Sequence, residues 1–444
     1  METVGKGSGP SKQISRRALL REAGAVTAAV AVARLTSTMG AASRAFAAPA
    51  PTRELIFMNV SRGMARPLGV LAARYEGQRG VKVTVDTPGP LEYPQKLLAS
   101  AQTNSMPDVF FLPPSAAYAP YIKAGWALPL RPELDKGWKD NFSRTALDLI
   151  EWRQDNPFGV PAGIYQVPLE VATFQMLYNP ALFERAKVPA NRVPFTMPQL
   201  LEILKALKAA GVGGFTTSVE AIPILLQSFV SNWLTDKEIE ATHAGKLPWA
   251  SMAYKKALQQ FVDMNDAGLI FNSPLNLRWA EMEKSFYNVR EVGVIYDGQW
   301  TVAVQRATAP DFTAYGSFRV PRAADAKHAQ RSVGVPDRNL AVNAKGRNVE
   351  ESLAFLKWMT DKEQADYLME AVPMLPTNPA SLLDATRVPR QFSAYVVEGP
   401  KAQKVSTVRS QRVEEALTKG VQALLLKRAT VDQVLADVDK AQKS

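Results

Sequence analysis

The stretch Glu54-Leu55-Ile56-Phe57-Met58-Asn59-Val60 is a compact apolar run of strand length, and the turn-like residues Ser61-Arg62-Gly63 follow it. Between residues 68 and 75, apolar side chains recur at the spacing of one helix face, and residues 81–85 alternate valine with polar residues. Residues 106–112 then predict a third strand. Strand–helix–strand units of this kind build parallel sheets covered by helices, so the predicted fold class is α/β.

The N-terminal segment has the three parts of a cleaved export signal. Its basic start contains Arg16 and Arg17, and the apolar run from Ala23 to Ala33 is shorter than the roughly 20 residues needed to span a membrane. Small residues precede a cleavage site after Ala47. We therefore expect residues 1–47 to be removed as a signal peptide.

Composition narrows the class of the remaining chain. The 444 residues are 46% hydrophobic, and after cleavage enough chain remains for two ordinary domains. Cysteine is absent, which excludes disulfides, cysteine metal sites and a lipid anchor on cysteine. The two histidines, His243 and His328, lie apart in polar surroundings and predict solvated imidazoles. No metal or other cofactor is expected.

The positive net charge is smaller than it first looks. The formal charge is +11, and the leader accounts for five of these charges with seven basic and two acidic residues. The remaining charge is spread over the chain without a basic run. This pattern does not fit a nucleic-acid-binding protein, so no nucleic-acid partner is expected.

The leader also resembles a known export signal. In Ser15-Arg16-Arg17-Ala18-Leu19-Leu20-Arg21, Ser-Arg-Arg precedes one variable position, two apolar positions and a basic residue. This order resembles the twin-arginine signature, except that Leu19 stands where phenylalanine is most common. The resemblance implies a protein that the twin-arginine translocase exports in folded form, to the periplasm.

Four blocks of sequence follow one another along the rest of the chain, within residues 54–130, 163–200, 292–300 and 339–365. The third reads Val-Gly-Val-Ile-Tyr-Asp-Gly-Gln-Trp, a short apolar strand that turns at glycine before a tryptophan. In this order and spacing, the blocks resemble the extracellular solute-binding proteins of ABC importers, in the group that contains the sugar receptors.

The resemblance implies a two-lobed periplasmic binding protein fold of type II, in which each lobe is a mostly parallel sheet flanked by helices and the ligand cleft lies at the hinge. We expect lobe 1 to comprise residues 48–168 and 321–375, and lobe 2 to comprise residues 169–320 and 376–444 with the C-terminal helices. A solute that contacts both lobes favours the closed state, which an inner-membrane ABC permease can recognise. The receptor itself is expected to be a monomer.

Two local departures from the family leave the solute open. Residues 334–339 replace a segment that is often rich in glycine, and Pro113-Pro114-Ser115 stands where maltose-type receptors carry aromatic and charged residues. The identity of the solute therefore does not follow from the resemblance.

Sugar sites pair aromatic rings with carboxylates, amides and guanidinium groups. By match to the family, Trp300 is the first candidate for stacking, with a place in the core as the alternative. Tyr165 and Trp233 have the same two interpretations, and Glu170 is either a hydroxyl acceptor or a solvated loop residue. The candidate cleft residues are Trp300, Tyr165, Glu170, Ser61, Arg62, Trp233, Arg338 and Asn339.

The leading hypothesis is a non-enzymatic receptor for a carbohydrate-like solute such as a sugar or polyol. A guanidinium at Arg338 would instead suit an acidic or phosphorylated solute, for example a glycerol phosphodiester or another organic anion. A secreted polysaccharide-degrading enzyme is the alternative of a different class, and it would need two carboxylates at a fixed separation across a cleft. No catalytic motif indicates such an enzyme.

Capping boxes predict two helix starts in the last quarter of the chain. Thr360 with Glu363, and Thr430 with Gln433, have the spacing at which a hydroxyl and an acid or amide satisfy the first free amides of a helix.

Overall fold

The computed structural model describes residues 54–89, 92–115, 117–154, 156, 158–189, 191–271, 277–372, 374–382, 390–405 and 409–443. The predicted signal peptide and its cleavage site lie outside these residues. Within the described ranges, no helix combines the length and the apolar character needed to cross a bilayer.

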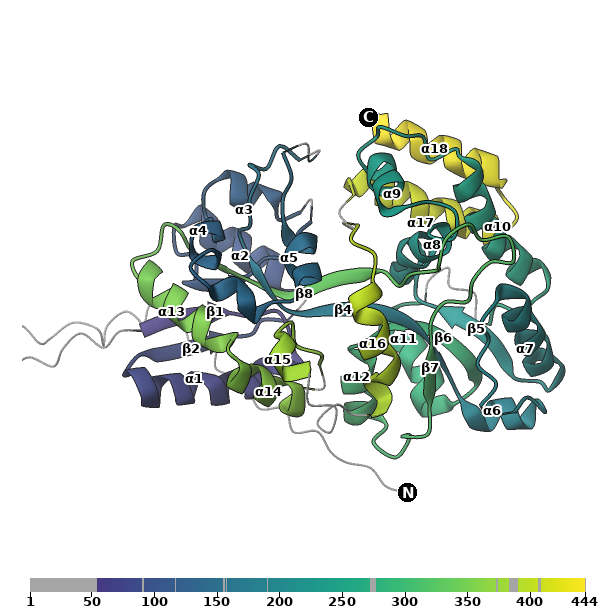
Figure 1. Ribbon diagram of the computed structural model, residues 1–444, viewed down its shortest axis with the longest axis horizontal. Helices are drawn as coiled ribbons and strands as arrows, with labels where there is room; N and C mark the ends of the chain where they lie inside the picture. The colour runs from purple at the N-terminus through teal and green to yellow at the C-terminus, as the bar shows by residue number, and fades with distance from the viewer. Residues whose placement is uncertain are drawn as a thin grey trace, which may run out of the picture. The chain divides into compact units, whose positions relative to one another are not determined.

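A single mixed sheet runs through the described chain in the order β2-β1-β3-β8-β4-β6-β5, and β7 pairs with β4 (Figure 1). The strands are β1 (Glu54–Met58), β2 (Lys82–Asp86), β3 (Val109–Phe111), β4 (Val167–Tyr178), β5 (Gly213–Thr217), β6 (Val292–Gly298), β7 (Gly316–Phe318) and β8 (Gly334–Val342).

The helices are α1 (Ala65–Arg79), α2 (Tyr93–Gln102), α3 (Ala119–Lys123), α4 (Arg131–Leu134), α5 (Arg144–Ile150), α6 (Pro180–Arg185), α7 (Met197–Ala209), α8 (Ile222–Val230), α9 (Asp236–His243), α10 (Met252–Asp266), α11 (Trp279–Lys284), α12 (Thr301–Thr308), α13 (Val349–Met359), α14 (Lys362–Ala371), α15 (Pro379–Leu382), α16 (Ser393–Glu398), α17 (Gln411–Leu425) and α18 (Val431–Lys443).

Two long strands connect the halves of the sheet. The first part of β4, residues 167–173, pairs with β8, and its second part, residues 174–178, pairs with β6. The last residues of β8, 340–342, pair with β3. The predicted α/β class is confirmed, but the sheet is mixed rather than mostly parallel. The reason is that β4 and β8 run antiparallel to all of their described partners, whereas β1 with its neighbours and β5 with β6 are parallel.

The first half of the sheet is covered on both faces. Leu55 and Phe57 lie in one buried cluster and Met58 in another, because side chains alternate along a strand. The predicted apolar face of α1 is buried, and its Tyr75 ring lies 5.0 Å from Phe355 and 5.1 Å from Trp358 of α13. Helices from distant parts of the sequence thus lie side by side (Figure 1). We call these clusters the first core.

The second core packs β5, β6 and the second part of β4 against α7, α8, α10, α17 and α18. Helices α17 and α18 bury Leu417 and Leu435 in it. The capping box of α18 is confirmed, since the Gln433 side chain accepts from the Thr430 backbone N–H at 2.8 Å and the Thr430 hydroxyl accepts from the Gln433 N–H at 3.3 Å.

The capping box predicted at Thr360 is wrong. Thr360 ends α13, and its hydroxyl donates back to the Lys357 carbonyl at 2.9 Å instead of accepting from the next helix. Asp361 occupies the N-cap position of α14. A threonine at a helix C-terminus can bond backward in this way, and sequence spacing alone does not distinguish the two geometries.

Candidate functional site

Three polar side chains meet where β4 and β8 connect the two halves of the sheet. Glu170 of β4 is fully buried and forms an ion pair with Arg338 of β8, whose side chain is 10% exposed. The Gln299 side chain, just after β6, donates to the other carboxylate oxygen of Glu170 at 2.7 Å. Two predicted site residues from distant parts of the sequence are therefore in direct contact. We call Glu170, Arg338 and Gln299 the hinge cluster.

The backbone of the hinge cluster is unusual at Arg338. Its φ of 49° lies in the left-handed region, which is uncommon for a residue with a side chain. Burial lowers the pKa of Arg338 to about 10, which still leaves the guanidinium charged at neutral pH. The next residue, Asn339, is fully buried, and its side-chain amide donates to the Pro336 carbonyl at 2.9 Å. Both predicted residues of this segment thus have protein partners, while Arg338 Nε and Asn339 Oδ1 have no hydrogen-bond partner among the described residues.

Trp300 is half-buried at the start of α12. Its ring meets Phe174 and Trp279 edge-on, at 5.2 Å and 5.1 Å between centroids. Its indole N–H donates to Glu283, which lies near the buried Asp297. Burial, and to a lesser degree the neighbouring Asp297 charge, raise the pKa of Glu283 to about 9. Trp300 is therefore packed on the second core while part of it remains exposed.

The other predicted residues are dispersed. Tyr165 is 7% exposed and belongs to the first core, and Trp233 is 6% exposed in the second core, where its indole N–H donates to Asp325 at 3.2 Å. Ser61 is half-buried, and its backbone N–H donates to the Asn59 side chain at 3.2 Å. The side chain of Arg62 lies outside the described part of the chain.

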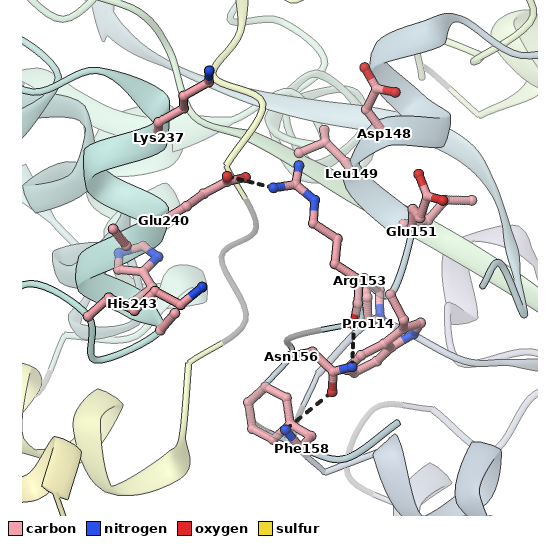
Figure 2. Close-up of a pocket in the computed structure, with 15 residues that line it drawn as sticks. Pro114, Asp148, Leu149, Glu151, Arg153, Asn156, Phe158, Lys237, Glu240 and His243 are labelled. Atoms are coloured by element: carbon pink, nitrogen blue, oxygen red, sulfur yellow. Dashed lines mark hydrogen bonds and ion pairs between the residues drawn. The ribbon is translucent and has the colours of Figure 1, made fainter. Parts of the chain in front are cut away.

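A cavity of about 220 Å³ opens between two segments that belong to different cores. One wall is the end of α5 and the loop after it, and the other is α9 with the residues that follow it (Figure 2). None of the eight predicted site residues lines this cavity. Its lining comprises Pro114, Asp148, Leu149, Ile150, Glu151, Trp152, Arg153, Asn156, Phe158, Lys237, Glu240, Ala241, His243, Ala244 and Lys246.

The aromatic part of the wall comes from the loop after α5. Trp152 is 5% exposed, and Phe158 meets its ring edge-on at 6.0 Å between centroids. The indole N–H of Trp152 has no hydrogen-bond partner among the described residues. Asn156 holds the loop in shape, since its side-chain amide donates to the carbonyl oxygens of Arg153 and Val160 at 2.6 Å and 2.7 Å.

Charged side chains face one another across the cavity. Arg153 donates to Glu240 of α9 at 2.6 Å, so this ion pair joins the two walls (Figure 2). Asp148 pairs with Lys404 at 3.4 Å, and Glu151 pairs with Arg131. Across the described residues, no group of three or more histidine or acidic side chains is arranged to hold a metal ion.

This cavity is not among the sites predicted from the sequence. A usable signal was present in residues 151–158, where Trp152 and Phe158 enclose charged residues and an Asn-Pro turn. The opposite wall gave no such signal, because His243 was interpreted as a solvated imidazole. It is instead 7% exposed and stacked on Trp249, with 5.3 Å between ring centroids.

Comparison with known proteins gives a family and a fold. The sequence model of the bacterial extracellular solute-binding protein family matches residues 64–366. A search of curated proteins found no match.

Among solved structures, an ABC transporter solute-binding protein from Thermotoga lettingae, bound with α-D-tagatose, has a TM-score of 0.71 and 18% identity over 88% of this chain and 100% of that chain. The GacH receptor of Streptomyces glaucescens, also solved with acarbose, has a TM-score of 0.70 and 20% identity over 88% of this chain and 97% of that chain. A cyclic α-maltosyl-1,6-maltose binding protein from Arthrobacter globiformis has a TM-score of 0.69 and 18% identity over 87% of this chain and 97% of that chain. At these identities the likeness shows the fold, and it confirms the predicted two-lobed type II class.

Proposed function

Because the chain belongs to the bacterial extracellular solute-binding protein family, we propose that it is the binding component of an ABC importer and that it captures a carbohydrate-like solute. The observation that carries this proposal is the cavity whose two walls come from different cores. A solute in such a cavity contacts both halves only when they are close, so it stabilises the closed arrangement that a permease recognises.

The distribution of the cores supports the two lobes. The sequence predicts residues 48–168 and 321–375 for lobe 1 and residues 169–320 and 376–444 for lobe 2, and we propose these lobes with one change of boundary and with β4 and β8 as the connections. Ala323 lies in the second core, whereas Leu340 lies in the first, which supports moving the second boundary from residue 321 into β8. In this proposal the buried hinge cluster sits at the crossing point.

The solute class rests on the relatives and on the cavity. The similar structures bind tagatose, acarbose or a cyclic maltosyl-maltose, according to their names. In the cavity, an indole, a phenyl ring and charged side chains lie together, as in sites for sugars. We propose binding without turnover, since the family is one of binding proteins.

We further propose that the protein is exported by the twin-arginine translocase, loses residues 1–47 and acts in the periplasm as a monomer. The support is the Ser15-Arg16-Arg17 segment and the small residues before Ala48.

A thermal-shift screen of the purified protein tests the function. Monosaccharides, oligosaccharides and polyols are added one at a time, and hits are measured by titration calorimetry. A ligand at 100 times its Kd adds about 2.7 kcal/mol to the free energy of unfolding. One-to-one binding with no product after prolonged incubation is expected. Release of product would contradict the receptor function, and absence of any stabilising compound would contradict a carbohydrate-like solute.

A further inference from the structure

Building on the proposed two-lobed receptor, we propose that the ion pair between Arg153 and Glu240 acts as a latch that favours the closed arrangement of the lobes. We call this contact the inter-lobe pair, and the closed arrangement is the one in which it is formed. Both members are protein groups, so the pair contributes to closure independently of the solute.

The two members of the inter-lobe pair belong to different cores. Arg153 directly follows Trp152, which is buried in the first core, and Glu240 of α9 directly follows Ile239, which is buried in the second core. The Arg153 guanidinium donates to the Glu240 carboxylate at 2.6 Å across the cavity (Figure 2). A movement that widens the cavity between these walls must therefore break the contact.

The wall that carries Arg153 is fixed on both sides of this residue. The Trp152 backbone exchanges two hydrogen bonds of 2.9 Å with the backbone of Gly163. The Asn156 side chain donates to the Arg153 carbonyl at 2.6 Å and accepts from the Val160 N–H at 3.1 Å. Since the backbone is already ordered, forming the inter-lobe pair costs only side-chain freedom.

The helix that carries Glu240 is anchored at its start. In the capping box of α9, the Glu238 side chain accepts from the Thr235 N–H at 2.8 Å and the Thr235 hydroxyl accepts from the Glu238 N–H at 3.4 Å. Asp236 in the first turn pairs with Arg331, which precedes β8. Because both walls are ordered in advance, we expect the inter-lobe pair to lie in the upper part of the range for exposed ion pairs.

An ion pair within lobe 1 provides a matched control. Glu151 also lines the cavity, and it pairs with Arg131 of α4, which belongs to the same lobe. Both glutamates are partly exposed, with side-chain values of 38% for Glu151 and 25% for Glu240. Glu151→Gln therefore removes the same charge from the same cavity but breaks no contact between the lobes.

A second contact between the cores should contribute less to closure. Asp148 of α5 pairs with Lys404, which directly precedes Val405 of the second core. The distance of 3.4 Å is longer than that of the inter-lobe pair, and Asp148 has a further cationic partner in Arg144 at 3.8 Å. Loss of Lys404 leaves that partner in place, so Lys404→Gln should shift the lobes less than Glu240→Gln.

The absence of cysteine from the chain allows a direct measurement of closure, since two introduced cysteines carry fluorophores at chosen sites. Ala124, just after α3, and Ala436 of α18 are exposed. Figure 1 shows α3 on the first half of the sheet and α18 on the second. Single-molecule energy transfer between these sites reports the ratio of closed to open molecules and requires no solute.

Glu240→Gln should lower the closed-to-open ratio about two- to fivefold at 0.1 M salt. Glu151→Gln should leave the ratio unchanged. Adding Arg153→Gln to Glu240→Gln should cause little further shift, because both substitutions remove one contact. Raising the salt to 1 M shortens the Debye length from about 10 Å to about 3 Å, so the effect of Glu240→Gln should shrink.

The outcomes distinguish the latch from the proposed function. A ratio that Glu240→Gln leaves unchanged, or that Glu151→Gln lowers equally, would overturn the latch, and the receptor function would stand if a sugar from the thermal-shift screen still shifts the ratio. A single distance that no variant and no sugar alters would contradict both. A loss of closed molecules in Glu240→Gln that Glu151→Gln does not reproduce would establish the latch.

Discussion

The hinge cluster makes a sharp prediction about stability. Glu170→Gln replaces a buried carboxylate with an amide of the same shape and leaves the Arg338 guanidinium, with its side chain only 10% exposed, with the Asp337 carboxylate at 3.7 Å as its remaining counter-charge. Breaking a buried ion pair in this way costs about 3–5 kcal/mol. The entropy of unfolding is about 2.1 cal/mol/K per residue near 60 °C. For the compact unit Pro51–Ser444, the thermal unfolding midpoint of Glu170→Gln should therefore lie about 4–6 °C below that of the unchanged protein.

The control is the same chemical change in an exposed pair. Glu240→Gln breaks the ion pair with Arg153. The Glu240 side chain is 25% exposed and the Arg153 side chain 51%, and such exposed pairs contribute about 0.2–1 kcal/mol to the free energy of unfolding. The midpoint of Glu240→Gln should move by about 1 °C or less. Both variants are measured by calorimetry under identical buffer conditions. Equal shifts would refute the reasoning. So would failure of the double change Glu170→Gln with Arg338→Met, which removes both buried charges, to recover most of the loss.

Three further predictions concern single residues. Burial raises the pKa of Glu283 to about 9, so the folded chain keeps a proton that the unfolded chain releases above about pH 4.5. Glu283 should make the free energy of unfolding fall by up to about 1.4 kcal/mol per pH unit from there to about pH 9, and Glu283→Gln should make the slope shallower in denaturation series at pH 5 to 8. Burial raises the pKa of the neighbouring Asp297 to about 7, so part of the slope below that pH should remain. Gly69→Ala lies at an exposed site of α1 with open space around it, so it should raise the free energy of unfolding by about 1 kcal/mol, measured as a higher denaturant midpoint. A lower midpoint would contradict the helical assignment. Gly298→Ala would place a methyl group on the Trp300 ring and should cost about 1–3 kcal/mol, so an unchanged midpoint would count against the packing described.

Much of the fold could be predicted because it depends on local patterns. The strand at 54–60 appears as β1, and the apolar face between Leu68 and Tyr75 is buried in α1. Alternation and helical spacing report which side chains face a core, whichever core that is. The mixed character of the sheet could not be predicted, because the directions of β4 and β8 depend on pairings between residues more than 150 positions apart in sequence.

The candidate site was harder to predict than the fold, because it also depends on contacts between residues far apart in sequence. The sequence predicted Glu170, after an expected lobe crossing, and Arg338, in a segment that departs from the family, and the structure brings these two residues into contact. The prediction itself gave no information on whether their polar groups were already satisfied by each other. The cavity wall at Trp152 and α9 was missed, since it depends on two short segments that only the fold places opposite each other.

Room for a solute separates the two regions physically. The Glu170 carboxylate has Gln299 as a hydrogen-bond donor and Arg338 as an ion-pair partner, so a solute that binds it would first have to displace one of them. Arg338 Nε and Asn339 Oδ1 beside it nevertheless have no hydrogen-bond partner among the described residues. The indole N–H of Trp152 is equally buried but has no partner among the described residues, so a solute acceptor gains a hydrogen bond without displacing one. Unpaired buried polar groups thus occur in both regions, and what distinguishes Trp152 is that it lines a cavity of about 220 Å³ with room for a solute, whereas Glu170 and Asn339 are fully buried. The hinge cluster is then better suited to hold the crossing strands together, and the cavity between α5 and α9 to take the solute.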